Sequence, residues 1–396
     1  MLWGELMENS RNSTSLWSKE YVITLLVGLI TSFGFSMVYT IISAYSIKIG
    51  ATLSIAGVVS GIFSISALVS RPFSGLVSDR YNKKRLFVVS TLAIAIAFLG
   101  YSVSSNISIL MFFRIFHGAA FALSGTASIA LISELVPKSR LAEGLGYFGV
   151  SQMISRIVGP SMGVYIKELF GYNTLFYCIA ALHILALLVL LVLPYKFTKQ
   201  RQQKKTKIAL IDLVAIEVLV YAAIGGVFSL GNGVINSFLV LMGAKRAISN
   251  ISLYFMVNAS AVAVARLFAG RQADQSSITS IVNVSLFCAA TAALLLSFGY
   301  SLAPIIYAAV LMGIGLAGGQ VSLQAECIRA VDEKRSGIAV STFYIGADVG
   351  NGIGPMIGGA ISNRFNYGAM FLSLGGLLSV TFLVFNIYQR RQLKTS

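Results

Sequence analysis

Twelve apolar stretches, separated by polar segments, run along the 396-residue chain. They lie near residues 21–47, 52–76, 86–104, 107–134, 145–166, 173–194, 210–242, 249–270, 278–299, 303–328, 338–361 and 368–388. A membrane-spanning helix needs about 20 apolar residues, and each of these stretches is long enough to supply them. The first is too long for a signal-peptide core, so we expect it to be retained as a span. The pattern predicts an all-α membrane protein with twelve transmembrane helices.

The connection between the sixth and seventh stretches is the longest and the most basic. It predicts two six-helix bundles joined by a cytoplasmic linker. The expected parts are a cytoplasmic N-terminus at 1–20, an N-terminal bundle at 21–194, the linker at 195–208, a C-terminal bundle at 209–388 and a cytoplasmic tail at 389–396.

Composition and charge narrow the class of protein. Hydrophobic residues make up 56% of the chain and charged residues only 11%, which excludes a disordered chain, a secreted disulfide scaffold and an ordinary soluble enzyme. The net charge is +16, and 21 of the 30 Lys and Arg residues fall on the membrane side that holds both termini, against 5 on the other side. This bias predicts that both termini are cytoplasmic. No nucleic-acid partner is expected, because the longest basic run is the linker.

An internal repeat appears at an offset of 195 residues. The segment from Arg71 to Asp79 (RPFSGLVSD) falls on the segment from Arg266 to Asp274 (RLFAGRQAD), and Gly159-Pro160 falls on Gly354-Pro355. The repeat therefore predicts two bundles of the same orientation. Parallel repeats of this kind place a substrate site between the halves near the membrane midplane.

Three motifs carry a resemblance to the major facilitator superfamily over essentially the whole chain. Gly75 to Arg85 (GLVSDRYNKKR) is similar to its loop 2–3 signature, Leu110 to Gly118 (LMFFRIFHG) to the span-4 signature of its proton-coupled drug exporters, and Gly159 to Gly163 (GPSMG) to the exporter signature of span 5. The sequence departs at Asn82, where Gly is usual and where Asn tolerates a left-handed backbone, and at His117, where Gln is common. The resemblance implies a monomeric transporter in a bacterial inner or plasma membrane.

The resemblance also implies a cytoplasmic gate that holds the two halves together. Arg71, Gly75 and Asp79 are spaced by four residues and share one helix face, and Asp274 repeats Asp79 in the second half. The alternative for Arg80 and the basic residues after it is anchoring at the cytoplasmic membrane surface. The residues expected to act in gating or in its motifs are Arg71, Gly75, Asp79, Arg80, Asp274, Asp348, Gly159, Pro160, Gly354 and Pro355.

Asp348 lies in the middle of span 11, where glycines recur every four residues from Gly346 to Gly358. Such a small-residue stripe is typical of tight helix packing in membranes. Span 11 packs against span 2 in the family, which suggests an ion pair between Arg71 and Asp348. The alternative is that Asp348 only locks the packing of its helix.

Three residues are candidates for proton coupling. Arg114 and His117 share a face of span 4, where the fixed charge of Arg114 disfavours protonation of His117 by repulsion. A histidine that takes a proton when the cavity rearranges could couple transport, whereas the alternative is a neutral His117 that only makes a hydrogen bond. Glu217 near the start of span 7 is a possible proton carrier or an interfacial side chain.

Polar residues on spans 1, 7 and 10 are candidates for a substrate cavity, because uncharged polar and aromatic groups suit a large amphipathic molecule. The alternative is hydrogen bonding between helices. The candidate cavity residues are Ser36, Tyr39, Ser43, Asn232, Asn236, Gln320 and Gln324.

We therefore predict proton-driven export of small amphipathic organic compounds, such as drugs or metabolites, by alternating access. The chain has no G-x-x-x-x-G-K-[ST] nucleotide loop and no HExxH or GxSxG motif, so an ion gradient should drive transport and no enzyme activity is expected. With only two histidines and three distant cysteines, neither a metal site nor a cofactor is expected. The alternatives are a proton-coupled uptake symporter and a dedicated exporter of one metabolite.

Overall fold

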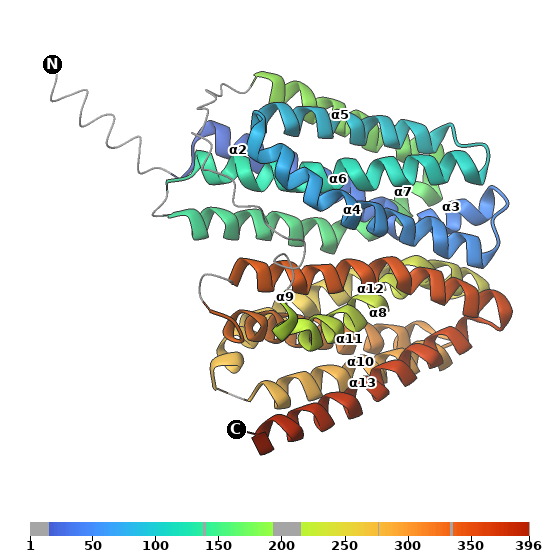
Figure 1. Cartoon of the computed structure of the whole chain (residues 1–396). Helices are drawn as coiled ribbons and strands as arrows, with labels where there is room; N and C mark the ends of the chain where they lie inside the picture. Colours follow the sequence, from blue (N-terminus) through green and yellow to red (C-terminus); the bar gives the residue numbers. More distant parts are fainter. Residues whose placement is uncertain (1–15, 138–139, 193–214, 276, 333–335, 396) are drawn as a thin grey trace, which may run out of the picture. The chain divides into compact units, whose positions relative to one another are not determined.

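The computed structural model describes residues 16–137, 140–192, 215–275, 277–332 and 336–395, and these ranges consist of helices and short connections (Figure 1). The elements are α2 (Lys19–Tyr39), α3 (Ile42–Lys48), α4 (Leu53–Arg80), α5 (Lys83–Ser102), α6 (Ile107–Leu135), α7 (Leu141–Val192), the 3-10 turn η3 (Ile216–Val218), α8 (Leu219–Lys245), α9 (Leu253–Gln275), α10 (Ile278–Phe298), α11 (Leu302–Arg329), α12 (Ser336–Arg364) and α13 (Tyr367–Thr395). Helices α2 and α3 form the first span and α7 carries the fifth and sixth, so the prediction of twelve helical spans is confirmed.

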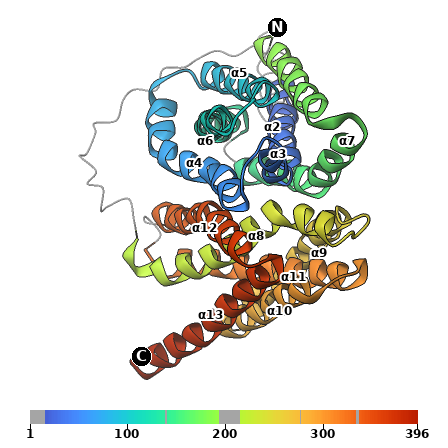
Figure 2. The same ribbon diagram turned by 90° about the vertical axis from the view of Figure 1, so that its right-hand side faces the viewer.

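The chain forms two compact units, residues 1–37 with 69–200 and residues 38–68 with 201–396. In the first unit, α5 lies against α6 and α7. In the second unit, α8 lies against α12, while α11 contacts both α9 and α10, and α10 contacts α13 (Figure 2). Residues 38–68, expected in the N-terminal bundle, group with the second unit. The predicted linker and bundle boundaries stay a prediction.

One glycine separates the fifth and sixth spans. Gly171 lies inside α7 with φ 85° and ψ 174°, a backbone conformation that disfavours residues with a Cβ. The two spans are therefore separate helices that meet at a kink at Gly171.

Asn82 begins α5 as its N-cap. Its side chain accepts a hydrogen bond from the Arg85 backbone N–H at 3.0 Å, which satisfies one of the free donors at the helix start. The φ of Asn82 is −59°, so this position does not use the left-handed backbone that Asn tolerates.

The glycine stripe of α12 packs against α8 in the second unit. A Cβ on Gly350 would collide with the carbonyl oxygen of Gly226, and a Cβ on Gly346 would collide with that of Ala222 one turn earlier. The backbones of the two helices are therefore in direct contact, which confirms the predicted use of the stripe in tight packing.

Another face of α12 contacts the part of α4 that belongs to the same unit. A Cβ on Gly61 would collide with the carbonyl oxygen of Gly352, and the hydroxyls of Ser60 and Ser237 share a buried hydrogen bond of 2.6 Å between α4 and α8. Span 11 therefore packs against span 2 as expected, through residues 53–68. These contacts explain why that segment groups with the second unit.

The first unit repeats the packing of α12 on α8. Gly159 and Gly163 of α7 lie against α2: a Cβ on Gly159 would be 2.7 Å from the Ser36 Cβ, and a Cβ on Gly163 would collide with the carbonyl oxygen of Met37. Their counterparts at the offset of 195 are Gly354 and Gly358 on α12. Matching glycines thus make matching helix contacts in both units.

Replacing Gly350 with Ala should destabilise the protein, because neither backbone can yield without separating α8 from α12. Overpacking of this kind typically costs about 1–3 kcal/mol. We expect a lower Tm for Gly350→Ala in detergent, measured by thermal unfolding. The matched control is Gly376→Ala in α13, where no described atom lies within 4 Å of the added Cβ and no loss is expected. Equal Tm values for the two variants would contradict the packing.

Candidate functional site

The buried polar residues of the first unit gather around α6. Arg114 and His117 lie one turn apart and expose 0% and 1% of their surface, while Phe112 and Ile115 on other faces of the helix are exposed. The helical period therefore turns a charged and a titratable side chain toward the neighbouring helices.

Tyr101, in the last turn of α5, joins these two residues. Its hydroxyl is 2.9 Å from His117 Nδ1, and the Arg114 guanidinium acts on the same hydroxyl through its charge and a side-chain hydrogen bond. A guanidinium can only donate, so the Tyr101 oxygen accepts from Arg114 and its proton is left for His117 Nδ1. One hydroxyl thus links a permanent charge to a titratable ring.

The second histidine of the chain lies in the same cluster. Phe98 of α5 is 4.8 Å from His117 and 5.2 Å from His183 of α7, measured between ring centroids. His183 is fully buried, and its Nδ1 is 2.8 Å from the carbonyl oxygen of Ile179. We call Phe98, Tyr101, Arg114, His117 and His183 the imidazole cluster.

Helix α2 covers the imidazole cluster through a glycine. A Cβ on Gly34 would lie 2.7 Å from His183 Cε1 and 2.7 Å from Ile179 Cγ2. One residue further along α2, Phe35 packs against Phe121 of α6, with 4.9 Å between ring centroids. The absence of a side chain at Gly34 lets span 1 approach the cluster.

Sequence reasoning identified Arg114 and His117 but missed Tyr101 and His183 as their neighbours. No spacing in the sequence reveals this proximity, because it depends on the register of α5 and α7 against α6. The occurrence of both histidines of the chain in apolar spans was the only available signal.

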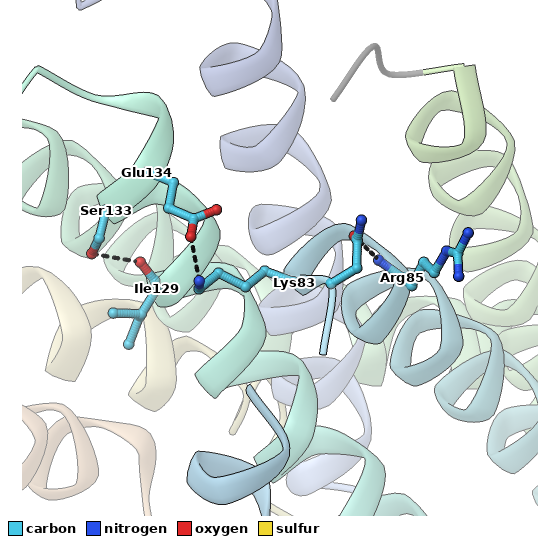
Figure 3. Close-up of polar contacts among 6 residues, drawn as sticks. Lys83, Arg85, Ile129, Ser133 and Glu134 are labelled. Atoms are coloured by element: carbon cyan, nitrogen blue, oxygen red, sulfur yellow. Dashed lines mark hydrogen bonds and ion pairs between the residues drawn. The ribbon is translucent and has the colours of Figure 1, made fainter. Parts of the chain in front are cut away.

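The loop residues expected in the gate make contacts within the first unit. Lys83 forms an ion pair with Glu134 of α6 (Figure 3), and Lys84 Nζ donates to the carbonyl oxygen of Leu191 at 2.9 Å. These contacts tie α5 to α6 and α7.

The structure describes fewer contacts for the other gate candidates. The side chains of Asp79, Arg80 and Asp274 lie outside the described residues. No described atom is within 4 Å of the position of a Gly75 Cβ. The roles of all four residues in gating stay predictions.

The structure leaves the proposed Arg71–Asp348 pair as a prediction. Arg71 is exposed and belongs to the first unit, whereas Asp348 is half-buried and belongs to the second.

Glu217 lies in η3 ahead of α8 and is exposed, which is the position of an interfacial side chain. Its role as a proton carrier also stays a prediction.

Several residues expected in a substrate cavity make hydrogen bonds within the second unit. Asn236 Nδ2 donates to the backbone and side-chain oxygens of Asn232 at 2.7 and 2.9 Å. Gln320 donates to Ser229 Oγ at 3.3 Å. Hydrogen bonding within and between helices therefore occupies three of the predicted amides.

The remaining cavity candidates are partly buried in helix packing. Gln324 donates to the Tyr344 hydroxyl at 3.4 Å, and Ser36, Tyr39 and Ser43 are all buried.

In the described residues, no three His, Cys, Asp or Glu side chains gather as metal ligands would.

Replacing Tyr101 with Phe should destabilise the imidazole cluster, because it removes the hydroxyl shared by Arg114 and His117. Leaving a buried polar group without its partner costs about 1–3 kcal/mol. Thermal unfolding of Tyr101→Phe should show a lower Tm than the matched control Tyr177→Phe, whose ring is half exposed on α7. Identical Tm values would show that the Tyr101 hydroxyl does not stabilise the protein.

Comparison with known proteins agrees with this architecture. The family model of the Major Facilitator Superfamily matches residues 24–244 and 221–395. The chain is 25% identical to the multidrug resistance protein MdtG of Salmonella arizonae, over 96% of this chain and 98% of MdtG. It is 27% identical to the quinolone resistance protein NorA of Staphylococcus aureus, over 43% of this chain and 45% of NorA.

Solved structures show the same fold at low sequence identity. A variant of the nucleoside transporter NupG superposes with a TM-score of 0.82 at 13% identity, covering 93% of this chain and 99% of NupG. A bacterial homologue of the human lysosomal transporter Spinster gives a TM-score of 0.79 at 14% identity, with 96% and 99% coverage. The chain is a transporter that belongs to the Major Facilitator Superfamily.

Proposed function

We propose that this transporter exports small amphipathic organic compounds in exchange for protons, by alternating access of two bundles. The observation that carries the proposal is the Tyr101-linked pair of Arg114 and His117, which is buried in span 4. MdtG and NorA, which are named for multidrug and quinolone resistance, support export as the direction.

The chemistry of the pair suits proton coupling. A charged side chain inside a membrane span costs at least about 2.5–3.5 kcal/mol, so a retained guanidinium points to a function. Its fixed positive charge disfavours a proton on the neighbouring imidazole as long as the two are held together. A rearrangement that separates Arg114 from His117, or lets water reach them, would let the ring bind a proton. The ring can then lose that proton when the packed arrangement returns.

The remaining motif residues belong to the same proposal. Arg71, Asp79 and Asp348, with the basic loop residues, would hold the cytoplasmic side closed. Substrate would bind among the polar residues of spans 1, 7 and 10. The protein would act as a monomer with both termini in the cytoplasm, as the bias of its positive charges suggests.

Uptake by symport is the second candidate. The structures of similar fold include the nucleoside transporter NupG and a POT family transporter in complex with a thioalcohol-conjugated peptide. A fold shared at this identity does not decide the direction of transport, because direction depends on the site. A dedicated exporter of one metabolite would share the mechanism but not the breadth of substrates.

Replacing Arg114 with Ala should abolish proton-driven transport. In everted membrane vesicles with an acidic lumen, fluorescence of a lipophilic cation such as ethidium reports its uptake into the lumen. We expect Arg114→Ala to fall to the level of vesicles without the protein. Arg114→Lys, which keeps the charge but loses the planar fork, should retain part of the activity.

The matched control is Arg364→Ala, since Arg364 is exposed at the end of α12. It should transport at the wild-type rate. The amount of each variant in the membrane and its Tm separate a folding defect from a coupling defect. Full proton-driven uptake by a folded Arg114→Ala variant would remove Arg114 from the mechanism.

A further inference from the structure

His183 is a buried titratable group to which the proposed function assigns no role. Its Nδ1 lies 2.8 Å from the Ile179 carbonyl oxygen, and a carbonyl can only accept a hydrogen bond. Nδ1 must therefore carry the hydrogen, which makes Nε2 of the neutral ring an unprotonated acceptor. Nε2 is buried and has no hydrogen-bond partner among the described residues. The structure thus holds a basic nitrogen with its lone pair unused.

The first unit offers few other places for a proton within its spans. Its described carboxylates all lie near helix ends: Glu20, Glu134, Glu143 and Glu168. Besides Arg114, the fully buried titratable groups among its described residues are Tyr21 of α2, Tyr101 of α5, His117 of α6 and His183 of α7. A proton bound inside the described part of this unit at neutral pH would therefore sit on an imidazole, because a tyrosine hydroxyl does not bind one.

The groups that face His183 come from every helix packed around it. Helix α2 contributes Gly34, which carries no charge, and α5 contributes the Phe98 ring. Helix α6 contributes His117, which interacts electrostatically with His183, and beside it Arg114. None of these neighbours is acidic, so a positive charge on His183 would have no counter-ion among them.

We propose that His183 Nε2 is a proton-binding site of the transporter, and that the bound proton is linked to the position of span 1 through Gly34. The inference rests on the proposed proton coupling. A proton from water adds to the Nε2 lone pair and creates an N–H that has no acceptor in the packed cluster. Binding therefore favours an arrangement in which α2 withdraws and water reaches the ring.

The two histidines would not be protonated together. Both rings pack against Phe98, and like charges this close in an apolar interior repel strongly. Arg114 disfavours a proton on His117 as long as the two are held together. The pair would therefore titrate as a coupled unit that takes up one proton, which His183 holds in the packed cluster and which His117 can accept once Arg114 and His117 separate.

Because the chain has only two histidines, nitrogen-15 NMR can observe the site directly. The full-length protein, labelled at histidine and held in lipid nanodiscs, should give two sets of imidazole signals, which His183→Gln and His117→Gln assign. At high pH, His183 should be the tautomer with hydrogen on Nδ1. In the arrangement that lets water reach the ring, it should become protonated between about pH 8 and about pH 5, and a bound lipophilic cation should move the midpoint to lower pH.

Two outcomes would overturn the proposal. One is a His183 that stays neutral over this whole range, both with and without the cation. The other is a hydrogen on Nε2 at high pH. The NMR result decides about His183 even if vesicles show that the wild-type protein moves no protons, an outcome that would refute the proposed function instead.

Gly34→Ala tests the link to span 1. The added Cβ would push α2 away from His183, so the His183 midpoint should move to higher pH as water gains access. Gly149→Ala is the matched control in the first unit, because no described atom lies within 4 Å of its Cβ position. In vesicles, His183→Gln should keep substrate counterflow but lose the dependence of export on luminal pH. An unchanged midpoint in Gly34→Ala, or an unchanged pH profile in His183→Gln, would contradict the linkage.

Discussion

Lipid offers no hydrogen bonds, so a polar group within a span is costly unless it finds a partner in the protein. Arg114 meets this constraint in its most demanding form, because its guanidinium is always charged and fully buried. The Tyr101 hydroxyl accepts a hydrogen bond from Arg114 and donates one to His117 Nδ1. These bonds join α5 to α6, and the Phe98 ring of α5 also packs against His183 of α7. One buried charge is thus part of the packing of three helices in the first unit.

Close backbone contact completes the arrangement. Because lipid chains are as apolar as leucine, helices in a membrane associate through tight packing and not through exclusion of water. Glycines at equivalent places bring α7 onto α2 and α12 onto α8. Gly34 likewise allows a close helix approach, which brings span 1 to the edge of the His183 ring. A small displacement of α2 would change the surroundings of a titratable nitrogen.

Much of the fold could be predicted because its signals are local or repeated. Apolar length defined the spans, and the glycine stripe from Gly346 to Gly358 predicted a tight helix contact. What the sequence did not reveal depends on tertiary register or on backbone detail. Tyr101 and His183 join the site from other helices, and Asn82 serves as the N-cap of α5. The grouping of residues 38–68 with the second unit arises from helix contacts that no sequence period encodes.

The account depends most on the exchange of a proton for substrate, which proton movement in proteoliposomes measures directly. The purified protein is reconstituted with a lipophilic cation and a pH-sensitive dye inside, at equal pH on both sides, with the membrane potential clamped. As the cation leaves down its gradient, an antiporter should bring protons in and acidify the lumen, which protein-free liposomes should not do. A lumen that becomes alkaline, or that keeps its pH while the cation leaves through the protein, would contradict the account.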